Sequence, residues 1–428
     1  MTDGQIRATV VAISLGWLFS AVDIILLILF QNEIASDLHL DLQTVRVAIG
    51  VGLLGSAVGG LFFAQLGDRW GRVKALSASI IVYSVATGLM AFTQSSVELL
   101  SLRFIAGIGT GAEWSVGFAL LSEVWSPKSR GAIGGLVASM FNIGTFLAIG
   151  LFQSPLGWRA SFGVMATPAI FAIVLRRLIP ESPVWLDYQE AKRRGTLKRD
   201  LVFASQRSPI VSALSGPVRW TTIKLTLLFA VMNLGFYSFS TEFINYLQSD
   251  IDQGGLALSK SAQLPFQLTL NGASLLAVIV AGWLSDRLGR RRAALSFCLL
   301  GMVGFAWLSL ELSGATPAEL SAHATHLTLP FAVCCIGFGI NGVMGIFAPE
   351  LFPTPLRSTC PGVSQNLGKG VGGLMGPPLA GMLVVTQGYH QVLSYPGWLF
   401  LLIALLVYSL PEVGGRALDE HNSSPDRS

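Results

Sequence analysis

Long apolar stretches recur along the chain, and charged residues, proline or glycine bound each of them. Each stretch is close to the roughly 20 residues that cross a bilayer core as a helix. Because backbone polar groups cannot stay unpaired in hydrocarbon, such runs predict transmembrane α-helices. Twelve are expected, at residues 9–30, 44–66, 75–94, 98–122, 131–153, 158–179, 222–247, 264–284, 293–312, 326–349, 358–386 and 394–410. The pattern predicts an all-α membrane protein with twelve transmembrane helices.

Composition narrows the choice of protein class further. Of the 428 residues, 52% are hydrophobic and 12% are charged, against roughly 25% charged in a soluble domain. This excludes a soluble enzyme, a disordered scaffold and a disulfide-stapled secreted domain. The formal net charge of +4 is too small to predict a nucleic-acid partner. Four cysteines without paired spacing predict no metal or redox site. We therefore expect the protein to be embedded in a lipid bilayer.

Lysine and arginine decide the predicted orientation. They gather in alternate loops and in the central connection, whereas the opposite loops hold acidic residues such as Asp37, Asp41 and Asp250. The positive-inside rule therefore places both termini and the central connection in the cytoplasm. An even number of spans also requires both termini on one side. We expect a multi-pass protein of the cell (inner or plasma) membrane.

The chain contains an internal repeat. The sequence Asp-Arg-Trp-Gly-Arg at 68–72 recurs as Asp-Arg-Leu-Gly-Arg at 286–290, and each copy lies between the second and third spans of its half. A second echo is an acid seven residues before an arginine, at Glu123 and Arg130 and again at Glu350 and Arg357. A weaker echo relates Asn-Ile-Gly at 142–144 to Asn-Leu-Gly at 366–368. These echoes keep their order and a nearly constant offset, so they predict two pseudo-symmetric halves of six helices.

The repeat also sets the predicted domain boundaries. We expect an N-terminal six-helix bundle at 1–178 and a C-terminal six-helix bundle at 221–411. A polar cytoplasmic linker at 179–220 would join them, and 412–428 would form a cytoplasmic tail.

The repeated loops resemble the signature cytoplasmic loop of the major facilitator superfamily. The run Arg-Phe-Ile-Ala-Gly-Ile-Gly-Thr-Gly at 103–111 resembles that superfamily's fourth-helix motif. Further runs at 111–114, 123–125, 128–131 and 180–185 are similar to its metabolite:proton symporters. The branch that the chain resembles most carries sialate, lactate and aromatic acids. The resemblance implies secondary active transport by alternating access between the halves, with the proton as coupling ion and no other cofactor or metal.

In that superfamily the signature loop also latches the inner gate. The resemblance implies that Asp68 faces the eleventh span near Arg357, and that Asp286 faces the fifth near Arg130. The alternative is that these basic loops only fix the topology. The residues assigned to the gate are Asp68, Arg69, Gly71, Arg72, Asp286, Arg287, Gly289, Arg290, Glu123, Arg130, Glu350 and Arg357.

Ionisable residues within the spans are candidates for function, because each costs several kcal/mol in hydrocarbon. At a rise of about 1.5 Å per residue, Asp23 on the first span and Arg103 on the fourth reach similar depths, so a pair is expected. Glu113 lies roughly 22 Å along the fourth span and about 80° around it from Arg103. It is therefore expected to form a site of its own, apart from the pair of Asp23 with Arg103. We expect Asp23 and Glu113 to carry the coupled protons.

Lys369 is the preferred anchor for a substrate carboxylate. It lies near mid-depth in the eleventh span, where a cation needs either a protein acid or an anionic substrate beside it. A permanent ion pair between helices is the alternative. For Glu242, near the outer end of the seventh span, the alternative is solvation at the rim. The predicted substrate-binding residues are Arg103, Lys369, Asn142, Asn366, Glu242, Tyr237 and Trp114.

The predicted function is import of a small organic anion with protons. The anion would be a monocarboxylate, a sialate-like acid or an aromatic acid. A proton-coupled exporter of drugs or metabolites, a neutral sugar importer and a non-transporting nutrient receptor are the alternatives. The chain has no G-x-x-x-x-G-K-[ST] run for ATP, and no nucleophile–base cluster predicts an enzyme. A monomer is expected, and the residues name neither the substrate nor the direction of transport.

Overall fold

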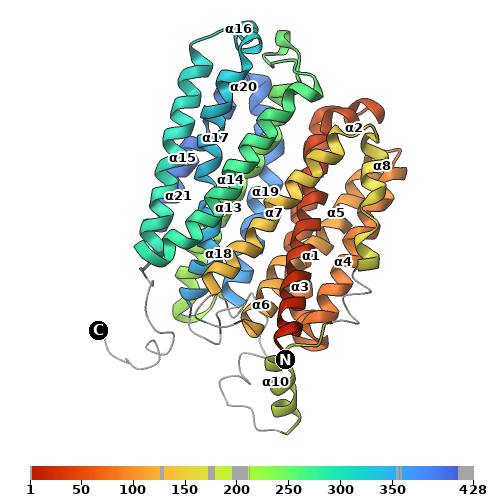
Figure 1. The fold of residues 1–428 in the computed structure, drawn as a ribbon, viewed down its shortest axis with the longest axis vertical. Coiled ribbons are helices and arrows are strands. Elements are labelled where there is room, and N and C mark those ends of the chain that lie inside the picture. The colour runs from red at the N-terminus through yellow and green to blue at the C-terminus, as the bar shows by residue number, and fades with distance from the viewer. Residues whose placement is uncertain are drawn as a thin grey trace.

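The computed structural model describes residues 2–125, 130–171, 179–194, 211, 213–352, 356 and 359–412. The regular elements within these ranges are helices, and the long ones stand side by side in Figure 1. The predicted all-α membrane fold is therefore confirmed. The start of α1 (Asp3–Leu29) lies at the lower side of the view, and α16 (Pro317–Ala322) lies at the upper side.

In the first half, the helices that follow the predicted spans are α1 (Asp3–Leu29), α3 (Leu42–Trp70), α4 (Arg72–Leu89), α5 (Ser96–Ala112), α6 (Phe118–Val124), α7 (Arg130–Gln153) and α8 (Gly157–Val164). The short α2 (Gln31–Asp37) follows the first span, and α10 (Pro183–Arg193) falls in the predicted linker. Between α5 and α6 the chain passes through one wide π-helical turn, η2 (Glu113–Gly117), so the fourth span is continuous. Such turns often occur at functional sites.

The second half repeats this arrangement. Its helices are α13 (Arg219–Gln248), α14 (Lys260–Leu288), α15 (Arg290–Ser313), α17 (Thr328–Gly337), α18 (Ile340–Glu350), α19 (Thr359–Gln387), α20 (Tyr389–Ser394) and α21 (Pro396–Tyr408). The predicted boundaries at 178 and 220 stay predictions, because 172–178 and 195–210 lie outside the described residues.

Ten helical stretches in the described ranges are long and apolar enough to cross a membrane. The sixth predicted span is described only in part, by α8. The eleventh is α19, which has 29 residues and is rich in buried glycine. Its glycines let neighbouring backbones approach: a Cβ at Gly372 would collide with the backbone of Ala230 on α13.

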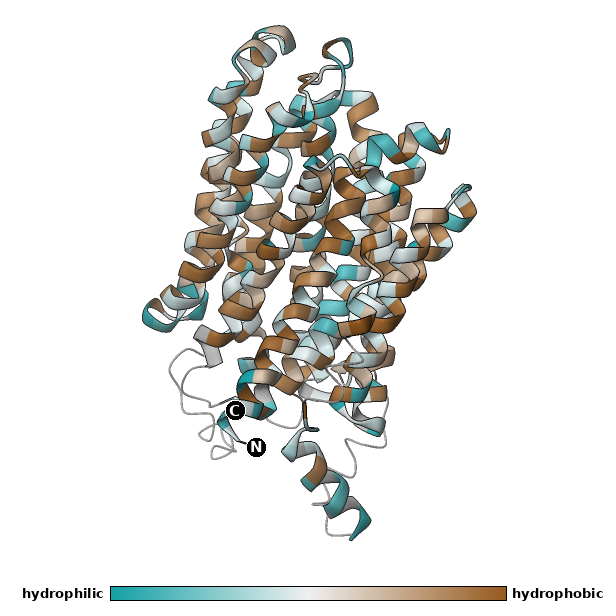
Figure 2. Ribbon diagram, turned by 45° about the vertical axis from the view of Figure 1, so that its right-hand side comes forward, coloured by the Kyte–Doolittle hydropathy of each residue, from teal (hydrophilic) through white to brown (hydrophobic). Residues whose placement is uncertain are grey.

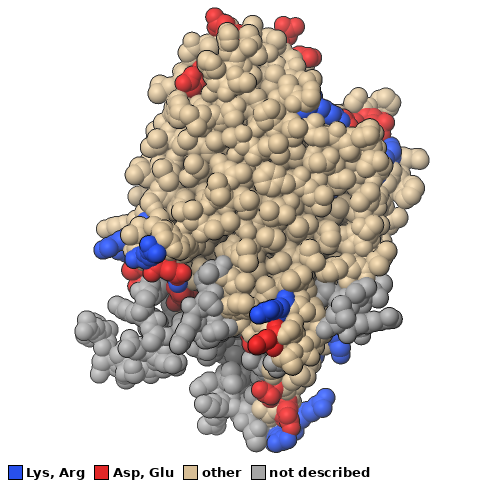
Figure 3. All heavy atoms as spheres, viewed as in Figure 1, with Lys and Arg blue, Asp and Glu red and all other residues tan. Residues whose placement is uncertain are grey.

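The surface of the molecule divides into bands. Hydrophobic residues dominate the middle of the helices and hydrophilic residues their ends (Figure 2). In the face shown in Figure 3, lysine, arginine, aspartate and glutamate gather at the two ends. Exposed apolar side chains such as Val385 and Leu310 therefore face lipid rather than water.

The two halves meet along two helix pairs, α3 with α19 and α7 with α14. Along the first pair, a Cβ at Gly370 would press on Ala57, and a Cβ at Gly60 would press on the side chain of Asn366. The space between these two seams holds the site described next.

Candidate binding cavity and its gates

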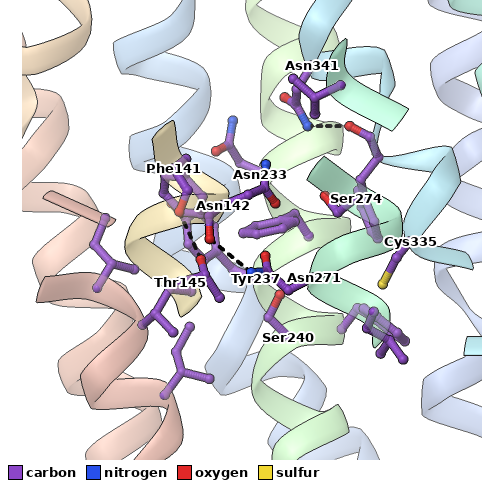
Figure 4. Close-up of a pocket in the computed structure, with 18 of the residues that line it drawn as sticks. Phe141, Asn142, Thr145, Asn233, Tyr237, Ser240, Asn271, Ser274, Cys335 and Asn341 are labelled. Atoms are coloured by element: carbon purple, nitrogen blue, oxygen red, sulfur yellow. Dashed lines mark hydrogen bonds between the residues drawn. The ribbon is translucent and has the colours of Figure 1, made fainter. Parts of the chain in front are cut away.

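A cavity of about 220 Å³ lies between the halves, near the middle of the helices (Figure 4). Aromatic side chains from both halves line it. Trp17, Trp114 and Phe141 come from the first half, and Phe236, Tyr237 and Phe338 come from the second. Phe141 meets Phe236 across the boundary, with ring centroids 6.1 Å apart. Flat apolar walls of this kind suit a small, planar ligand.

Several amide side chains line the cavity. Asn271 donates from Nδ2 to the backbone carbonyl of Asn142 at 2.9 Å, which joins α14 to α7 (Figure 4). Gln267 and Gln365 each carry a buried Oε1 that accepts no hydrogen bond from the described residues. Buried polar atoms are normally satisfied, so these oxygens are free to receive a ligand's donor.

Lys369 is the one charged residue among those that line the cavity. Its side chain is 8% exposed, and it makes no hydrogen bond or ion pair with any described residue. The structure therefore shows a cation without a protein counter-ion, rather than the alternative of a permanent ion pair. A cation in such surroundings favours an anionic ligand.

Asp23 and Arg103 form the expected pair inside the first half. Arg103 donates from Nη1 and Nη2 to the two carboxylate oxygens of Asp23, at 2.8 and 3.2 Å. The Thr87 hydroxyl also donates to Asp23. Both members of the pair are buried. Arg103 was expected to contact substrate, but its charge is used by Asp23 and it does not line the cavity.

Glu113 lies at a second site, separate from the pair of Asp23 with Arg103. It opens the turn η2 and is 1% exposed, and neither carboxylate oxygen has a hydrogen-bond partner within the described ranges. It packs against Gly16 of α1, where a Cβ would collide with the carboxyl group. Glu113 does not line the cavity, although its neighbour Trp114 does.

Glu242 closes the outer end of the molecule instead of binding in the cavity. Its carboxylate accepts from Nε and Nη2 of Arg46 on α3, at 2.8 and 2.7 Å, and from Asn245 at 3.2 Å. It is fully buried, so neither substrate contact in the cavity nor solvation at the rim describes it in this structure. The correction has a simple cause: Arg46, near the start of the second span, supplies its counter-ion.

Further polar contacts join the halves around this ion pair. Gln31 donates to the carbonyl of Thr241 at 3.0 Å, and Asn32 donates to Gln248 at 2.6 Å. Lys260 forms an ion pair with Glu33. Among the described residues, every hydrogen bond between the halves lies at this outer end, except the one between Asn271 and Asn142. These contacts join the two halves at the outer end.

At the inner end of the first half, the signature loop forms a compact corner. Gly71 has φ +110°, which lets α3 turn directly into α4. Nη2 of Arg72 lies 3.3 Å from Oε1 of Glu123. Glu181, which follows the sixth span, accepts at 3.1 Å from the backbone N–H of Val73. Arg69 is exposed.

The second half repeats this corner. Gly289 has φ +88°, and Nε of Arg290 lies 2.9 Å from Oε2 of Glu350. Glu412, after the last span, accepts from the backbone N–H groups of Arg290 and Arg291 at 3.0 and 3.1 Å. Arg287 stacks on Trp283.

The expected latch between the halves at this inner end stays a prediction. Asp286 pairs with Arg290 of its own loop at 2.5 Å. The side chains of Asp68 and Arg130, and Arg357 as a whole, lie outside what the structure describes.

Comparison with known proteins decides the family. The model of the Major Facilitator Superfamily matches residues 12–365. The chain belongs to this superfamily. It is a transporter rather than an enzyme. A solved structure of the proton:xylose symporter XylE aligns with a TM-score of 0.76 over 99% of both chains at 17% identity, which confirms the twelve-helix fold.

Three curated relatives cover nearly the whole chain. A putative metabolite transport protein of Haemophilus influenzae is 28% identical over 95% of this chain and 96% of its own. The niacin transporter NiaP of Acinetobacter baylyi is 26% identical over 95% and 94%. The benzoate transport protein of the same species is 26% identical over 91% and 87%.

Four of the seven predicted substrate-binding residues meet at the cavity: Lys369, Asn142, Tyr237 and Trp114. Asn366 does not, because its side chain lies between α19 and Gly60 of α3 and donates to the carbonyl of Gly362 at 2.8 Å. The sequence analysis missed the amides Gln267, Asn271 and Gln365. They could have been found from the sequence, because a side-chain amide within an apolar span needs a hydrogen-bond partner there and so marks a candidate binding residue.

Proposed function

We propose that this transporter imports a small organic anion together with protons, by alternating access between its two halves. The carrying observation is Lys369, a cation without a protein counter-ion in an aromatic cavity. The names of the relatives support an acid as substrate, because they include transporters of niacin, cis,cis-muconate and benzoate. Within this class, the flat walls and single cation favour an aromatic or conjugated monocarboxylate.

In this proposal the carboxylate of the substrate pairs with Lys369, and the ring packs against Phe141 and Phe236. The free oxygens of Gln267 and Gln365 receive a donor of the substrate, such as a hydroxyl or a ring N–H. One anion then replaces the missing counter-ion, so binding stabilises the occluded state that alternating access requires.

Protons enter the cycle at Asp23. When Asp23 is protonated it loses its charge, so Arg103 loses its ion-pair partner and the packing of α1 against α5 changes. Glu113 is the second carrier. The proton is the coupling ion and no other cofactor takes part. The protein acts as a monomer in the cell (inner or plasma) membrane, with both termini in the cytoplasm.

Uptake into proteoliposomes tests the proposal. With the lumen alkaline and the medium acidic, labelled nicotinate or benzoate should accumulate, and a protonophore should abolish accumulation. Lys369→Gln should weaken carboxylate binding by roughly 10- to 150-fold, because a hydrogen bond to a charged group contributes about 1.5–3 kcal/mol. Lys224→Gln, at the inner end of α13 and bonded only to the carbonyl of Ser409, is the matched control.

Three results would contradict the proposal. Equal affinity of Lys369→Gln and the wild type for the carboxylate would remove Lys369 from the site. Accumulation of labelled glucose but of no carboxylate would favour the neutral sugar importer. Efflux from acid-loaded liposomes, without uptake, would favour the exporter.

A further inference from the structure

A row of buried polar groups crosses the first half behind the cavity, from Asp23 to Glu113. The Thr87 hydroxyl donates to Asp23. Tyr83 lies one turn earlier on α4, on the same face as Thr87. Tyr83 is fully buried, and its hydroxyl has no hydrogen-bond partner among the described residues. At the other end, both carboxylate oxygens of Glu113 are also unpartnered.

The two carboxyl groups are too far apart for a direct proton transfer. Glu113 contacts α1 at Gly16, and Asp23 lies seven residues further along that helix, about 10 Å away. A proton passes only between groups within roughly 3 Å, or through one water. Tyr83 lies beside this gap: a Cβ at Gly109, one turn before Glu113 on the fourth span, would collide with the Cβ of Tyr83, and Tyr83 stands one turn before Thr87 on α4.

We propose that Tyr83 relays protons between Asp23 and Glu113. The relay rests on the proposed proton coupling and adds a route to it. The acid O–H bond of Asp23 breaks, and its proton passes by way of Thr87 and a bridging water to the Tyr83 oxygen. Tyr83 gives its own hydroxyl proton, through a second water, to a Glu113 oxygen. One proton has then moved, Asp23 is a carboxylate beside Arg103, and Glu113 is neutral.

The charged groups around this row agree with such a direction. Arg103 pairs with Asp23, whereas Glu113 has no cation paired with it in the described ranges. A proton that moves from Asp23 to Glu113 therefore leaves the negative charge on the acid that has a counter-ion, and it neutralises an unpaired buried charge at Glu113.

The route is separate from the path of the substrate. Asp23, Tyr83 and Glu113 do not line the cavity, whereas Trp17 and Trp114 do. The rings of Trp17 and Trp114 pack with centroids 5.6 Å apart, next to Gly16 and Glu113 in the chain. Protons would thus cross the first half without competing with the anion for space.

Tyr83→Phe tests the relay, because it removes one oxygen that holds no other group. Tyr246→Phe is the matched control: Tyr246 is also fully buried with an unpartnered hydroxyl, but it lies on α13 of the second half. Each variant is reconstituted as the full chain, with entrapped pyranine to follow protons and labelled benzoate or nicotinate to follow substrate.

The relay predicts a split between two assays. Tyr83→Phe should keep substrate exchange across the membrane at equal pH, since exchange needs no net proton movement. Its uptake driven by the pH gradient, and the proton flux that accompanies it, should fall by about tenfold or more. Tyr246→Phe should keep both. Glu113→Gln, as a second variant, should repeat the split of Tyr83→Phe.

Three outcomes would overturn the relay, and the first would also overturn the proton coupling on which it rests. Wild-type uptake that a pH gradient does not drive overturns proton coupling and the relay together. Coupled wild-type uptake that Tyr83→Phe matches in rate and in proton flux overturns the relay alone. A loss of exchange in Tyr83→Phe, equal to its loss of driven uptake, would show a structural role and also overturn it.

Discussion

The ion pair between Arg46 and Glu242 offers a direct test of how the outer end closes. It joins α3 of the first half to α13 of the second, and both side chains are buried. Glu242→Gln keeps the size of the side chain and removes its charge. Arg46 is then left as a buried cation, with a neutral amide in place of its carboxylate.

The size of the effect follows from this burial. Removing one partner of a buried ion pair costs about 3–5 kcal/mol, because the remaining charge stays uncompensated. In an outward-open state Arg46 would reach water, so the cost applies to the closed state alone. About 3 kcal/mol corresponds to a shift of roughly 100-fold toward the outward-open state.

A native cysteine reports this shift. All four cysteines are buried, and of these Cys335 lines the central cavity, whereas Cys298, Cys334 and Cys360 do not. With those three replaced by alanine, a membrane-impermeant maleimide added outside right-side-out vesicles should alkylate Cys335 slowly. In Glu242→Gln the rate should rise by one to two orders of magnitude.

A double variant separates the charge from the packing. Arg46→Met with Glu242→Leu removes both charges, and the replacement of a buried pair by apolar residues is often neutral. Its alkylation rate should therefore return toward that of the wild type. Equal alkylation of Cys335 in Glu242→Gln and in the wild type would refute the assignment of this pair to the outer gate.

Two further predictions concern Asp23 and the inner corner of the second half. Asp23→Asn should abolish uptake driven by a pH gradient but keep exchange at equal pH, as labelled benzoate would show; normal accumulation would remove Asp23 from the proton path. Glu412→Gln should lower stability by about 1 kcal/mol, because a neutral amide oxygen accepts less strongly from the N–H groups of Arg290 and Arg291. Thermal unfolding in detergent would measure this, and an unchanged midpoint would contradict it.

The sequence predicted what depends on length and periodicity. The pairing of Asp23 with Arg103 followed from a constant rise per residue along two long helices, and it is confirmed. The place of Lys369 near mid-depth followed in the same way. These arguments work because a bilayer forces regular helices of nearly fixed length.

The sequence did not predict which face each helix turns to the other half. Glu242 was read as a substrate contact because its partner, Arg46, lies 196 positions away on another helix. Asn366 lies one turn from Lys369 on α19, but its side chain turns toward Gly60 on α3. The wide turn at Glu113 leaves no mark in an apolar pattern, because a π turn inserts a residue without changing composition.

The inner corners explain how the two halves keep their shape while the contacts between them change. In each half, an acid after the last span accepts a hydrogen bond from the N-terminus of the third span: Glu181 from α4 in the first half, and Glu412 from α15 in the second. Both acids follow a proline, so this is a further echo of the internal repeat.

The polar contacts thus fall into two groups, those within one half and those between the halves. The inner ion pairs of the described residues, Arg72 with Glu123 and Arg290 with Glu350, stay within one half. The pair of Arg46 with Glu242 crosses between the halves. A rigid-body transition must preserve the first kind and break the second. Contacts within each half therefore carry stability, and those at the outer end set the balance between states, so substitutions at the outer end should change transport more than folding.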